Sequence, residues 1–481
     1  MGSTLTIADC VAALHARTTT ARQLVEEALR AIERTQETLN AFKVVCAQQA
    51  REEAIDADRR LAQGERLPLL GVPIAIKDDV DLEGHPTAFG CPGSFPPARR
   101  DCEMVRSLRR AGAIIIGKTN TPELGLYPFT EGEAFGIVRS PWSLEHTPGG
   151  SSGGAAAAVA AGIVPAAIGS DGAGSVRIPA AWCNLVGIKP QRGRISTAPE
   201  RNPFNGLECL GPLARTVQDA ALLLDVLGDE SGHNRQGRSD RHADSDRHEG
   251  PGRYLQAAGS EPPPLRIGLS LKAPPSAVRI PLDPQIARAS RRIASVLRGL
   301  GHTVGICHPR HRLIGLSLLV RGEAGVHRWA QRVPELRLLD PRTRGAVRNG
   351  ALLQRTMLPL AIAFEGRQRR RIGSAFERFD VLLTPTTATQ PLPIGAAEGL
   401  STWRTQKLIS SACPYAWPWN VLGWPALSIP AGLTEEGLPV GVQLLGGPDS
   451  EAVLVSLAAQ LQAVERWQER LPPHRVQAVC A

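Results

Sequence analysis

Residues 147–190 read TPGGSSGGAAAAVAAGIVPAAIGSDGAGSVRIPAAWCNLVGIKP. Two glycine-rich loops, residues 149–154 and 169–175, lie on either side of an alanine-rich segment and a short apolar run, residues 163–168. Glycine at this density removes Cβ atoms and permits positive φ, so successive backbone N–H groups can converge on one small anion. The stretch therefore predicts a helix between two loops that bring serine hydroxyls close to converging amides.

Ser151 and Ser152 stand where this helix begins. We expect a hydroxyl here to cap free amides, and the helix dipole favours negative charge at this end. Glycine and serine also cluster in ordinary turns, which leaves a structural role open for either loop alone. Two such loops in one short span, with a third element upstream, favour a functional site.

The third element is residues 71–79, GVPIAIKDD. Val72–Ile76 has the apolar character of a short buried strand, and Lys77 ends it. The chain holds only six lysines, so a lysine at a buried strand end stands out. Pairing with Asp78 or Asp79 would give it a structural role. Alternatively, burial favours the neutral amine, which can act as a base.

Together, GGSSGG, GSDGAGSVRIPA, GIKP and the upstream PIAIKDDV resemble the amidase signature family of serine hydrolases. The resemblance implies that Ser175 is the nucleophile and Ser151 a relay held by a cis peptide after Gly150. It implies that Lys77 is the base. Lys118, in GKTN after another expected strand, is the competing candidate for that role.

The resemblance also assigns the second loop to an oxyanion hole, formed by the backbone amides of Gly172, Ala173, Gly174 and Ser175. Many members have Asp-Thr-Gly-Gly-Ser where this chain has Asp-Gly-Ala-Gly-Ser, a change that keeps the backbone donors. Four further residues receive supporting roles: Gly150, Ser152, Asp171 and Arg177.

Aromatic and apolar residues near the expected pocket are candidates for substrate contact. They are Leu126, Tyr127 and Phe129 before the first loop, and Trp417 and Trp419 in a C-terminal segment. That segment resembles the family's NxxGxPAxSxP and GLPVGVQ pattern. Core packing explains each of these side chains equally well.

The order of expected strands and helices predicts an α/β fold, and the resemblance implies a central mixed β-sheet flanked by helices on both sides. We expect one domain over residues 1–481. Within it, residues 1–65 are an N-terminal helical scaffold, 66–228 the catalytic core, 229–262 a polar, exposed insertion whose composition is typical of disorder, and 263–481 the rest of the core with an active-site cap. Residues 199–212 read as a loop before a helix at 214–227.

The histidines do not suggest a metal site. Three of them, His233, His242 and His248, lie in the polar insertion and fit a solvated loop. A second group has ligand types without a recognised zinc spacing, namely His302, Cys307, His308 and His311. We therefore expect no metal and no cofactor.

Composition limits the partners. The net charge of +9 comes from scattered arginine without interleaved aromatics, which favours a solvated surface over a nucleic-acid partner. No apolar run is long enough to span a membrane. Nine cysteines without a C-x-x-C pair, and an N-terminus without an export pattern, predict a cytoplasmic setting. The resemblance implies a homodimer and a small-molecule amide substrate.

The function implied by the resemblance is hydrolysis of a carboxylic amide through an acyl-enzyme. Two rival interpretations of the loops fit less well. Residues 149–153 match a G-x-S-x-G nucleophile elbow, but a polar loop rather than a strand precedes them. No lysine-containing phosphate loop or dinucleotide fingerprint is present. The amidase-like component of a glutamyl-tRNA amidotransferase complex, and an acyl transferase with an amine acceptor, would share the same machinery and stay open as alternatives.

Overall fold

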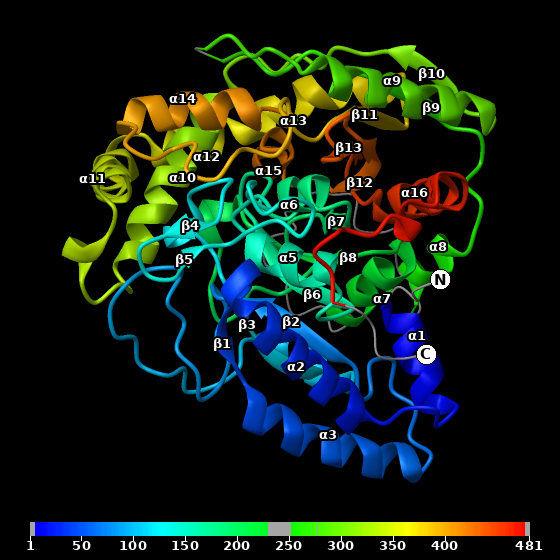
Figure 1. The fold of residues 1–481 in the computed structure, drawn as a ribbon. Coiled ribbons are helices and arrows are strands. Elements are labelled where there is room, and N and C mark those ends of the chain that lie inside the picture. The colour runs from blue at the N-terminus through cyan, green and yellow to red at the C-terminus, as the bar shows by residue number, and fades with distance from the viewer. Residues whose placement is uncertain (1–4, 229–251, 277, 477–481) are drawn as a thin grey trace.

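One mixed sheet forms the centre of the protein, as seen in a computed structural model that describes residues 5–228, 252–276 and 278–476 (Figure 1). Its 11 strands are in the order β1-β3-β2-β6-β8-β7-β12-β13-β11-β9-β10. They are β1 (Phe42–Val45), β2 (Pro73–Lys77), β3 (Ile114–Thr119), β6 (Ala166–Asp171), β7 (Val186–Lys189), β8 (Cys209–Ala214), β9 (Arg266–Leu269), β10 (Thr303–Ile306), β11 (Val381–Pro385), β12 (Ala426–Leu433) and β13 (Pro439–Leu445). A separate ribbon pairs β4 (Glu131–Gly132) with β5 (Gly136–Ile137).

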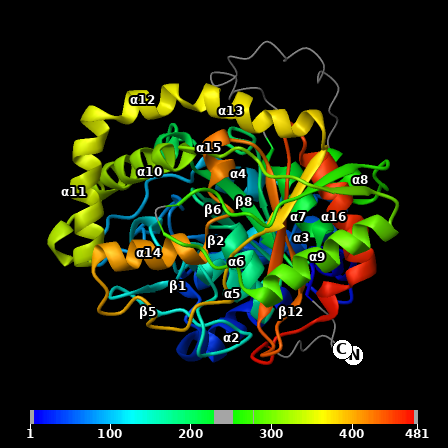
Figure 2. The ribbon, with the colours of Figure 1, turned by 90° about the horizontal axis from the view of Figure 1, so that it is seen from above.

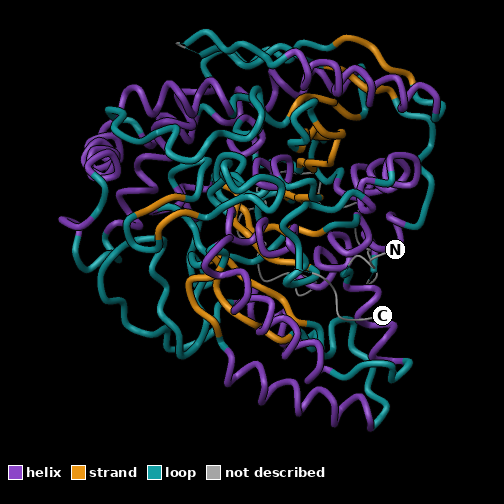
Figure 3. Tube along the Cα trace, viewed as in Figure 1, coloured by secondary structure: helices purple, strands orange, loops and turns teal. Residues whose placement is uncertain are grey.

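Helices lie around this sheet, whose strands extend across the molecule to β9 and β10 at the upper right edge of the view (Figure 3). They are α1 (Ile7–His15), α2 (Ala21–Leu39), α3 (Ala47–Ala62), α4 (Glu103–Arg110), α5 (Gly153–Ala161), α6 (Arg177–Trp182), α7 (Val217–Leu227), α8 (Arg253–Ala258), α9 (Pro284–Gly299), α10 (Ile314–Ala330), α11 (Pro341–Thr356), α12 (Leu358–Ala363), α13 (Glu365–Gly373), α14 (Thr402–Ala412), α15 (Pro418–Leu422) and α16 (Glu451–Glu465). Helices α5 and α6 pack on one face of the sheet, and α4, α7 and α16 on the other. Helices α10 to α13 form an arc beside it (Figure 2). The expected mixed sheet flanked by helices on both sides is confirmed.

The parallel strands β3, β2 and β6 position the first functional residues. Every residue of these three strands is buried, as expected for parallel strands covered on both faces. Strand β2 runs parallel to both neighbours, with Ile76 opposite Lys118 of β3 and opposite Ile168 of β6. The carboxyl ends of β2 and β6 therefore lie side by side, which brings Lys77 next to the second glycine-rich loop.

Helix α5 lies unusually close to the sheet because its sequence, GGAAAAVAA, has only small side chains. All nine of its residues are buried. A Cβ atom on Gly154 would lie 2.4 Å from the carbonyl oxygen of Ala41 and 2.6 Å from the amide nitrogen of Asn120. Both neighbours are backbone atoms, so no side chain fits at this position.

The expectation that residues 199–212 form a loop is wrong at its C-terminal end. Strand β8 lies in the middle of the sheet, antiparallel to both β6 and β7. Its sequence, CLGPLA, obscures this, because proline cannot donate to a ladder and is rare in central strands. Pro212 nevertheless stands opposite Ile168, and Gly211 approaches the Ile188 carbonyl so closely that a Cβ atom would lie 2.0 Å from that oxygen.

Two further expectations need correction. The N-terminal scaffold, residues 1–65, is not only helical, since β1 joins the sheet antiparallel to β3. Within the expected polar insertion, residues 253–258 form α8, which packs against α7 and α16 and buries Tyr254. Residues 229–251 lie outside the described part of the chain, and so do His233, His242 and His248. The division into one domain with these subregions stays a prediction.

The steric role of Gly154 leads to a test of the helix–sheet contact. We expect Gly154→Ala to lower the free energy of unfolding by about 1–3 kcal/mol, because the added methyl group must displace backbone. Urea unfolding followed by circular dichroism measures this. The matched control is Gly299→Ala at the end of α9, where nothing lies within 4 Å of the added Cβ. The control should be neutral or stabilising by up to about 1 kcal/mol, and equal effects at both sites would contradict the steric argument.

Candidate active site

Lys77, at the end of β2, is the centre of a buried hydrogen-bond network. Its side chain is 1% exposed. Its Nζ donates to Ser151 Oγ over 2.8 Å and to Ser170 Oγ over 2.7 Å, and lies 2.9 Å from Asp79 Oδ2. An ammonium group has three N–H donors, so each donor of Lys77 has an acceptor here.

Ser170 and Asp79 complete this network, and sequence reasoning did not place either in the catalytic machinery. Ser170 Oγ donates to Asp79 Oδ2 over 2.6 Å. Asp79 lies in the turn that follows β2, and its separation of only two residues from Lys77 is the signal that could have linked them. Ser170 precedes Asp171 in the second glycine-rich loop and is brought to Lys77 by the pairing of β2 with β6.

Lys118, the competing candidate for the base, belongs to a different buried pair. Its Nζ lies 2.8 Å from Asp78 Oδ1 and donates to the carbonyl oxygen of Pro86 and to Thr87 Oγ1. Burial raises the pKa of Asp78, and the charge of Lys118 opposes that effect. The two aspartates after Lys77 thus serve two lysines, and Lys77 lies next to Asp79 while also donating to Ser151.

The first glycine-rich loop presents Ser151 to Lys77. The Gly150–Ser151 peptide bond is cis, as the resemblance implied. A Cβ atom on Gly150 would lie 2.4 Å from the Tyr127 carbonyl oxygen, so this position admits only glycine. Ser152 is the N-cap residue of α5 but does not cap it, contrary to expectation. Its hydroxyl donates instead to the carbonyl oxygen of Ser170 over 3.1 Å, which ties the two loops together.

A nucleophile elbow is absent from this part of the chain. Within the described residues, no strand of the sheet directly precedes Gly149, and the preceding segment makes only isolated bridges, such as His146 with Pro393. The G-x-S-x-G match is therefore fortuitous.

The second glycine-rich loop is held by a fully buried ion pair between Asp171 and Arg177. Arg177 Nε lies 2.9 Å from Asp171 Oδ2, and Nη2 lies 3.0 Å from Oδ1. Asp171 also accepts from the amide of Gly174 over 2.7 Å and from that of Val176 over 3.3 Å. Burial alone would raise the pKa of Asp171, but the charge and hydrogen bonds of Arg177 outweigh it and hold that pKa well below its ordinary value.

Arg177 is anchored by residues far away in sequence. Its guanidinium donates to the carbonyl oxygen of Ala416 over 2.7 Å, to Asn420 Oδ1 over 2.7 Å and to Gln443 Oε1 over 3.1 Å. Asn420 Nδ2 in turn donates to the Asp171 carbonyl oxygen over 2.7 Å. Asn420 and Gln443 belong to the C-terminal motif, whose role sequence reasoning did not assign.

The tip of the second loop is the part that reaches the surface. Gly172 and Ser175 are half-buried and Ala173 is exposed, whereas the residues around them are buried. The amide of Gly174 is already engaged by Asp171, so its predicted place in the oxyanion hole does not fit this geometry. Within the described chain, the amides of Ala173 and Ser175 have no hydrogen-bond acceptor. The Ser175 carbonyl oxygen accepts from the amide of Ser152 over 3.2 Å.

The predicted substrate-contact residues lie mostly in apolar clusters. Tyr127 and Phe129 are buried and stacked, with ring centroids 5.2 Å apart. Trp419 is buried and donates to the carbonyl oxygen of Gly446 over 2.8 Å. Leu126 and Trp417 are half-buried at the edges of these clusters. Their contact with a substrate stays a prediction.

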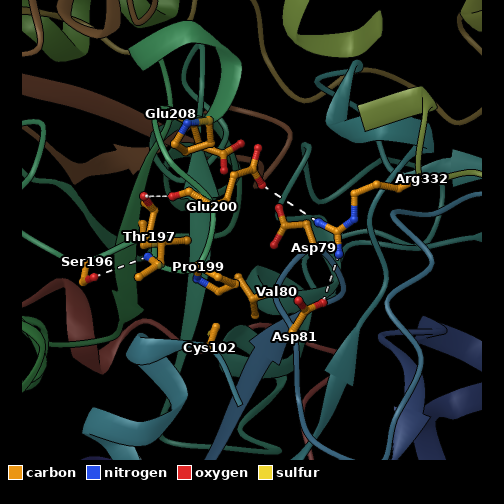
Figure 4. A pocket seen from close by; sticks show the side chains of 13 residues that line it. Asp79, Val80, Asp81, Cys102, Ser196, Thr197, Pro199, Glu200, Glu208 and Arg332 are labelled. Atoms are coloured by element: carbon orange, nitrogen blue, oxygen red, sulfur yellow. Dashed lines mark hydrogen bonds and ion pairs between the residues drawn. The ribbon is translucent and has the colours of Figure 1, made fainter. Parts of the chain in front are cut away.

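A small acidic pocket lies beside this network (Figure 4). Asp79 lines it together with Asp81, Glu200, Glu208 and Arg332. Glu208 immediately precedes β8, where Cys209 pairs with Asp171, so Glu208 stands across from the start of the exposed loop tip. Burial, and then the negative charges of Asp79 and Glu200, raise the pKa of Glu208 well above its ordinary value.

No metal site is found in the described residues, because no three of their histidine, cysteine, aspartate and glutamate side chains are grouped to hold an ion. His302, in the second group of possible ligands, instead accepts from the amide of Leu265 over 3.0 Å through Nδ1. None of the described helices is both long enough and apolar enough to cross a membrane.

Known proteins match this chain over nearly all of its length. The family model "Amidase" matches residues 23–455. The chain is 50% identical over 469 residues to "Putative amidase AmiA2" of Mycobacterium tuberculosis, covering 97% of this chain and 94% of that protein. It is 34% identical over 496 residues to the A-type subunit of the glutamyl-tRNA(Gln) amidotransferase of Roseiflexus sp., covering 97% of this chain and 98% of that one.

Two solved structures show the same fold. A 6-aminohexanoate cyclic dimer hydrolase complexed with substrate superposes with a TM-score of 0.86 at 29% identity, covering 98% of each chain. A bacterial aryl acylamidase of the amidase signature family has a TM-score of 0.83 at 26% identity, covering 96% of this chain and 97% of that one. The family match, the 50% identity and the shared fold show that this chain belongs to the amidase signature family and is an amide hydrolase.

Proposed function

We propose that this hydrolase cleaves the C–N bond of a small-molecule, non-peptide carboxylic amide through an acyl-enzyme on Ser175, with Ser151 and Lys77 as the proton relay. One observation carries the proposal. Lys77 Nζ makes a 2.8 Å hydrogen bond to Ser151 Oγ while Ser170 and Asp79 occupy its other two donor directions.

The relay follows from counting the hydrogens of Lys77. As a neutral amine it has two N–H groups and one lone pair. If the N–H groups point to Ser170 and Asp79, the lone pair faces Ser151 Oγ and can accept its proton. Ser151 takes the proton of Ser175 as Ser175 Oγ forms a bond to the substrate carbonyl carbon.

The second half of the reaction reverses the relay. The tetrahedral intermediate collapses, the C–N bond breaks, and the proton returns through Ser151 to the departing amine. Water then attacks the ester of Ser175 in the same way and releases the carboxylic acid. An amine in place of water would give acyl transfer from the same acyl-enzyme, so that alternative depends on the acceptor.

The amides of Ala173 and Ser175, with that of Gly172, are the proposed oxyanion donors. They sit at the only exposed part of a loop whose other polar groups are held by Asp171 and Arg177. A preorganised donor of this kind contributes about 2.7–4 kcal/mol to transition-state stabilisation.

The proposal also covers whether the enzyme acts alone, where it is located and its oligomeric state. Its relatives at 50% identity are named amidases, which favours a stand-alone enzyme over a component of an amidotransferase complex. The eight described cysteines are buried thiols outside any disulfide, in keeping with a cytoplasmic location. A homodimer remains part of the proposal on the family resemblance alone.

The nucleophile is tested by covalent labelling. We expect a fluorophosphonate to add once to the wild-type protein, and not to Ser175→Ala, because only the activated hydroxyl attacks phosphorus. Intact-protein mass spectrometry reads the adduct. Ser151→Ala should label much more slowly but at the same residue. An adduct that persists in Ser175→Ala and is lost in Ser151→Ala would assign the nucleophile to Ser151 instead.

The base is tested by comparing two buried lysines. We expect Lys77→Met to slow labelling and amide hydrolysis by about 10²–10⁴-fold, the usual loss on removing a general base. Lys118→Met is the matched control, since Lys118 is equally buried and paired with an aspartate but does not contact Ser151. It should lower stability and leave the rate per folded molecule within about tenfold. The reverse ranking of rates would make Lys118 the base.

The loop-holding ion pair is tested through acid stability. The folded pKa of Asp171 is depressed below the ordinary 3.8, so its stabilisation is present above that pH and is lost as pH falls further. We expect Asp171→Asn to cost about 3–5 kcal/mol at pH 7, because it leaves Arg177 buried and unpaired. The difference from wild type should shrink below pH 3.8.

Urea unfolding of wild type and Asp171→Asn at pH 7 and pH 3 measures the difference in free energy of unfolding at each pH. The control is Glu26→Gln, which removes an exposed partner of Arg51 and should cost less than about 1 kcal/mol. A difference between Asp171→Asn and wild type that does not change with pH would show that Asp171 acts through shape rather than charge.

A further inference from the structure

The acidic pocket of Figure 4 has more negative than positive side chains. Four carboxyl groups line it, from Asp79, Asp81, Glu200 and Glu208, against the single guanidinium of Arg332. Arg332 Nη2 lies 3.2 Å from Asp81 Oδ1 and Nη1 lies 4.0 Å from Glu200 Oε2. Glu200 also accepts from Trp329 Nε1 over 2.8 Å. Asp81 and Glu200 therefore have partners within the protein.

The other two carboxyl groups are incompletely paired. Asp79 uses Oδ2 for Lys77 and Ser170, but its Oδ1 is buried and has no hydrogen-bond partner among the described residues. Glu208 is 8% exposed, and its carboxyl forms neither a hydrogen bond nor an ion pair with any residue that the structure describes. A buried carboxylate oxygen without a donor is unfavourable, as for Asp79 Oδ1, and Glu208 lines the same pocket, so both are suited to receive donors from a ligand.

The position of these two groups relates the pocket to the reaction. Asp79 is bonded to Lys77, and Glu208 stands across from the loop tip that carries the proposed oxyanion donors. In the proposed relay, the leaving nitrogen receives its proton from Ser151, which is bonded to Lys77. The amine portion of the substrate must therefore lie beside Ser151, whose partner Lys77 is bonded to Asp79 of the pocket.

We propose that this pocket is a subsite for the amine portion of the substrate, and that Glu208 and Asp79 select amides whose amine portion carries a primary ammonium group. The proposal rests on the proposed function, since it uses the relay through Ser151 to orient the substrate. Three N–H donors on a compact cation match the free oxygens of two carboxylates.

The charges around Glu208 add a pH dependence. Asp79, Glu200 and Asp171 repel a negative charge there, Lys77 attracts it, and Arg332 is shared by Asp81 and Glu200. Burial and this repulsion raise the pKa of Glu208. Binding of an ammonium group favours the carboxylate, so affinity for the cation should rise as pH rises through that pKa.

A matched pair of substrates tests the proposal: N-(2-aminoethyl)butanamide and N-propylbutanamide, which share the acyl group and the length of the amine portion. We expect wild type to have at least a tenfold higher kcat/KM for the cationic amide at pH 7. Glu208→Gln should reduce that preference at least tenfold by raising KM for the cationic amide, with the N-propyl amide unchanged. The preference should increase as pH rises through the raised pKa of Glu208 in wild type and stay flat with pH in Glu208→Gln.

The control is Glu83→Gln, which removes the same charge from an exposed residue that follows β2. It should keep the wild-type preference. Equal or lower kcat/KM for the cationic amide in wild type, or a preference that survives in Glu208→Gln, would overturn the ammonium subsite and leave the amidase mechanism intact.

A second measurement does not depend on turnover. Propylammonium chloride should slow fluorophosphonate labelling of Ser175 in wild type, 1-propanol at the same concentration should not, and Glu208→Gln should weaken the protection at least tenfold. Labelling of wild type that propylammonium does not slow would also overturn the subsite. Absence of labelling in wild type would instead overturn the proposed nucleophile, so the two failures are distinguishable.

Discussion

The ion pair between Asp171 and Arg177 is the interaction on which the rest of the site depends. Both side chains are fully buried, and removing two charges from water is costly unless the remaining hydrogen-bonding groups are satisfied. Here they are, because Asp171 accepts from loop amides while Arg177 donates to Ala416, Asn420 and Gln443. The pair thereby holds a glycine-rich segment, whose backbone would otherwise be flexible, in a single conformation. It also fastens the N-terminal half of the sheet to the C-terminal strands.

The network around Lys77 depends on the same principle of complete pairing. A lysine at the end of a buried strand needs acceptors for its N–H groups, and three different segments supply them. Asp79 follows β2, Ser170 lies in β6 and Ser151 precedes α5. The hydroxyl of Ser170, which accepts from Lys77 and donates to Asp79, leaves little freedom in how the amine is oriented. In the proposed relay, Ser151 is the neighbour of Lys77 that passes the proton to and from Ser175.

Small residues make these approaches possible. Helix α5 can lie against the sheet because Gly154 and the alanines after it add almost no bulk, and Gly150 passes within contact distance of the Tyr127 carbonyl. The two glycine-rich loops are consequently close enough for Ser152 to donate to backbone oxygen of Ser170. The density of glycine and alanine in residues 147–190 therefore reflects steric requirements of packing as well as the chemistry of the loops.

Much of this protein was determined by local sequence. The apolar run of β2 with its terminal lysine, the alanine-rich helix, the two serine loops and their resemblance to the amidase signature family follow from short-range patterns, since periodicity and glycine content act within a few residues. Only the tertiary structure decided which groups meet. Asn420 and Gln443 reach Arg177 from more than 200 positions away, and no local pattern encodes that contact. Glu208 was not predicted as a site residue because Pro212 made β8 resemble a loop. Its place opposite the loop tip depends on the register between the non-consecutive strands β6 and β8. Pairing across a sheet is set by the packing of the whole chain, which is why the acidic pocket beside Lys77 became apparent only in the folded protein.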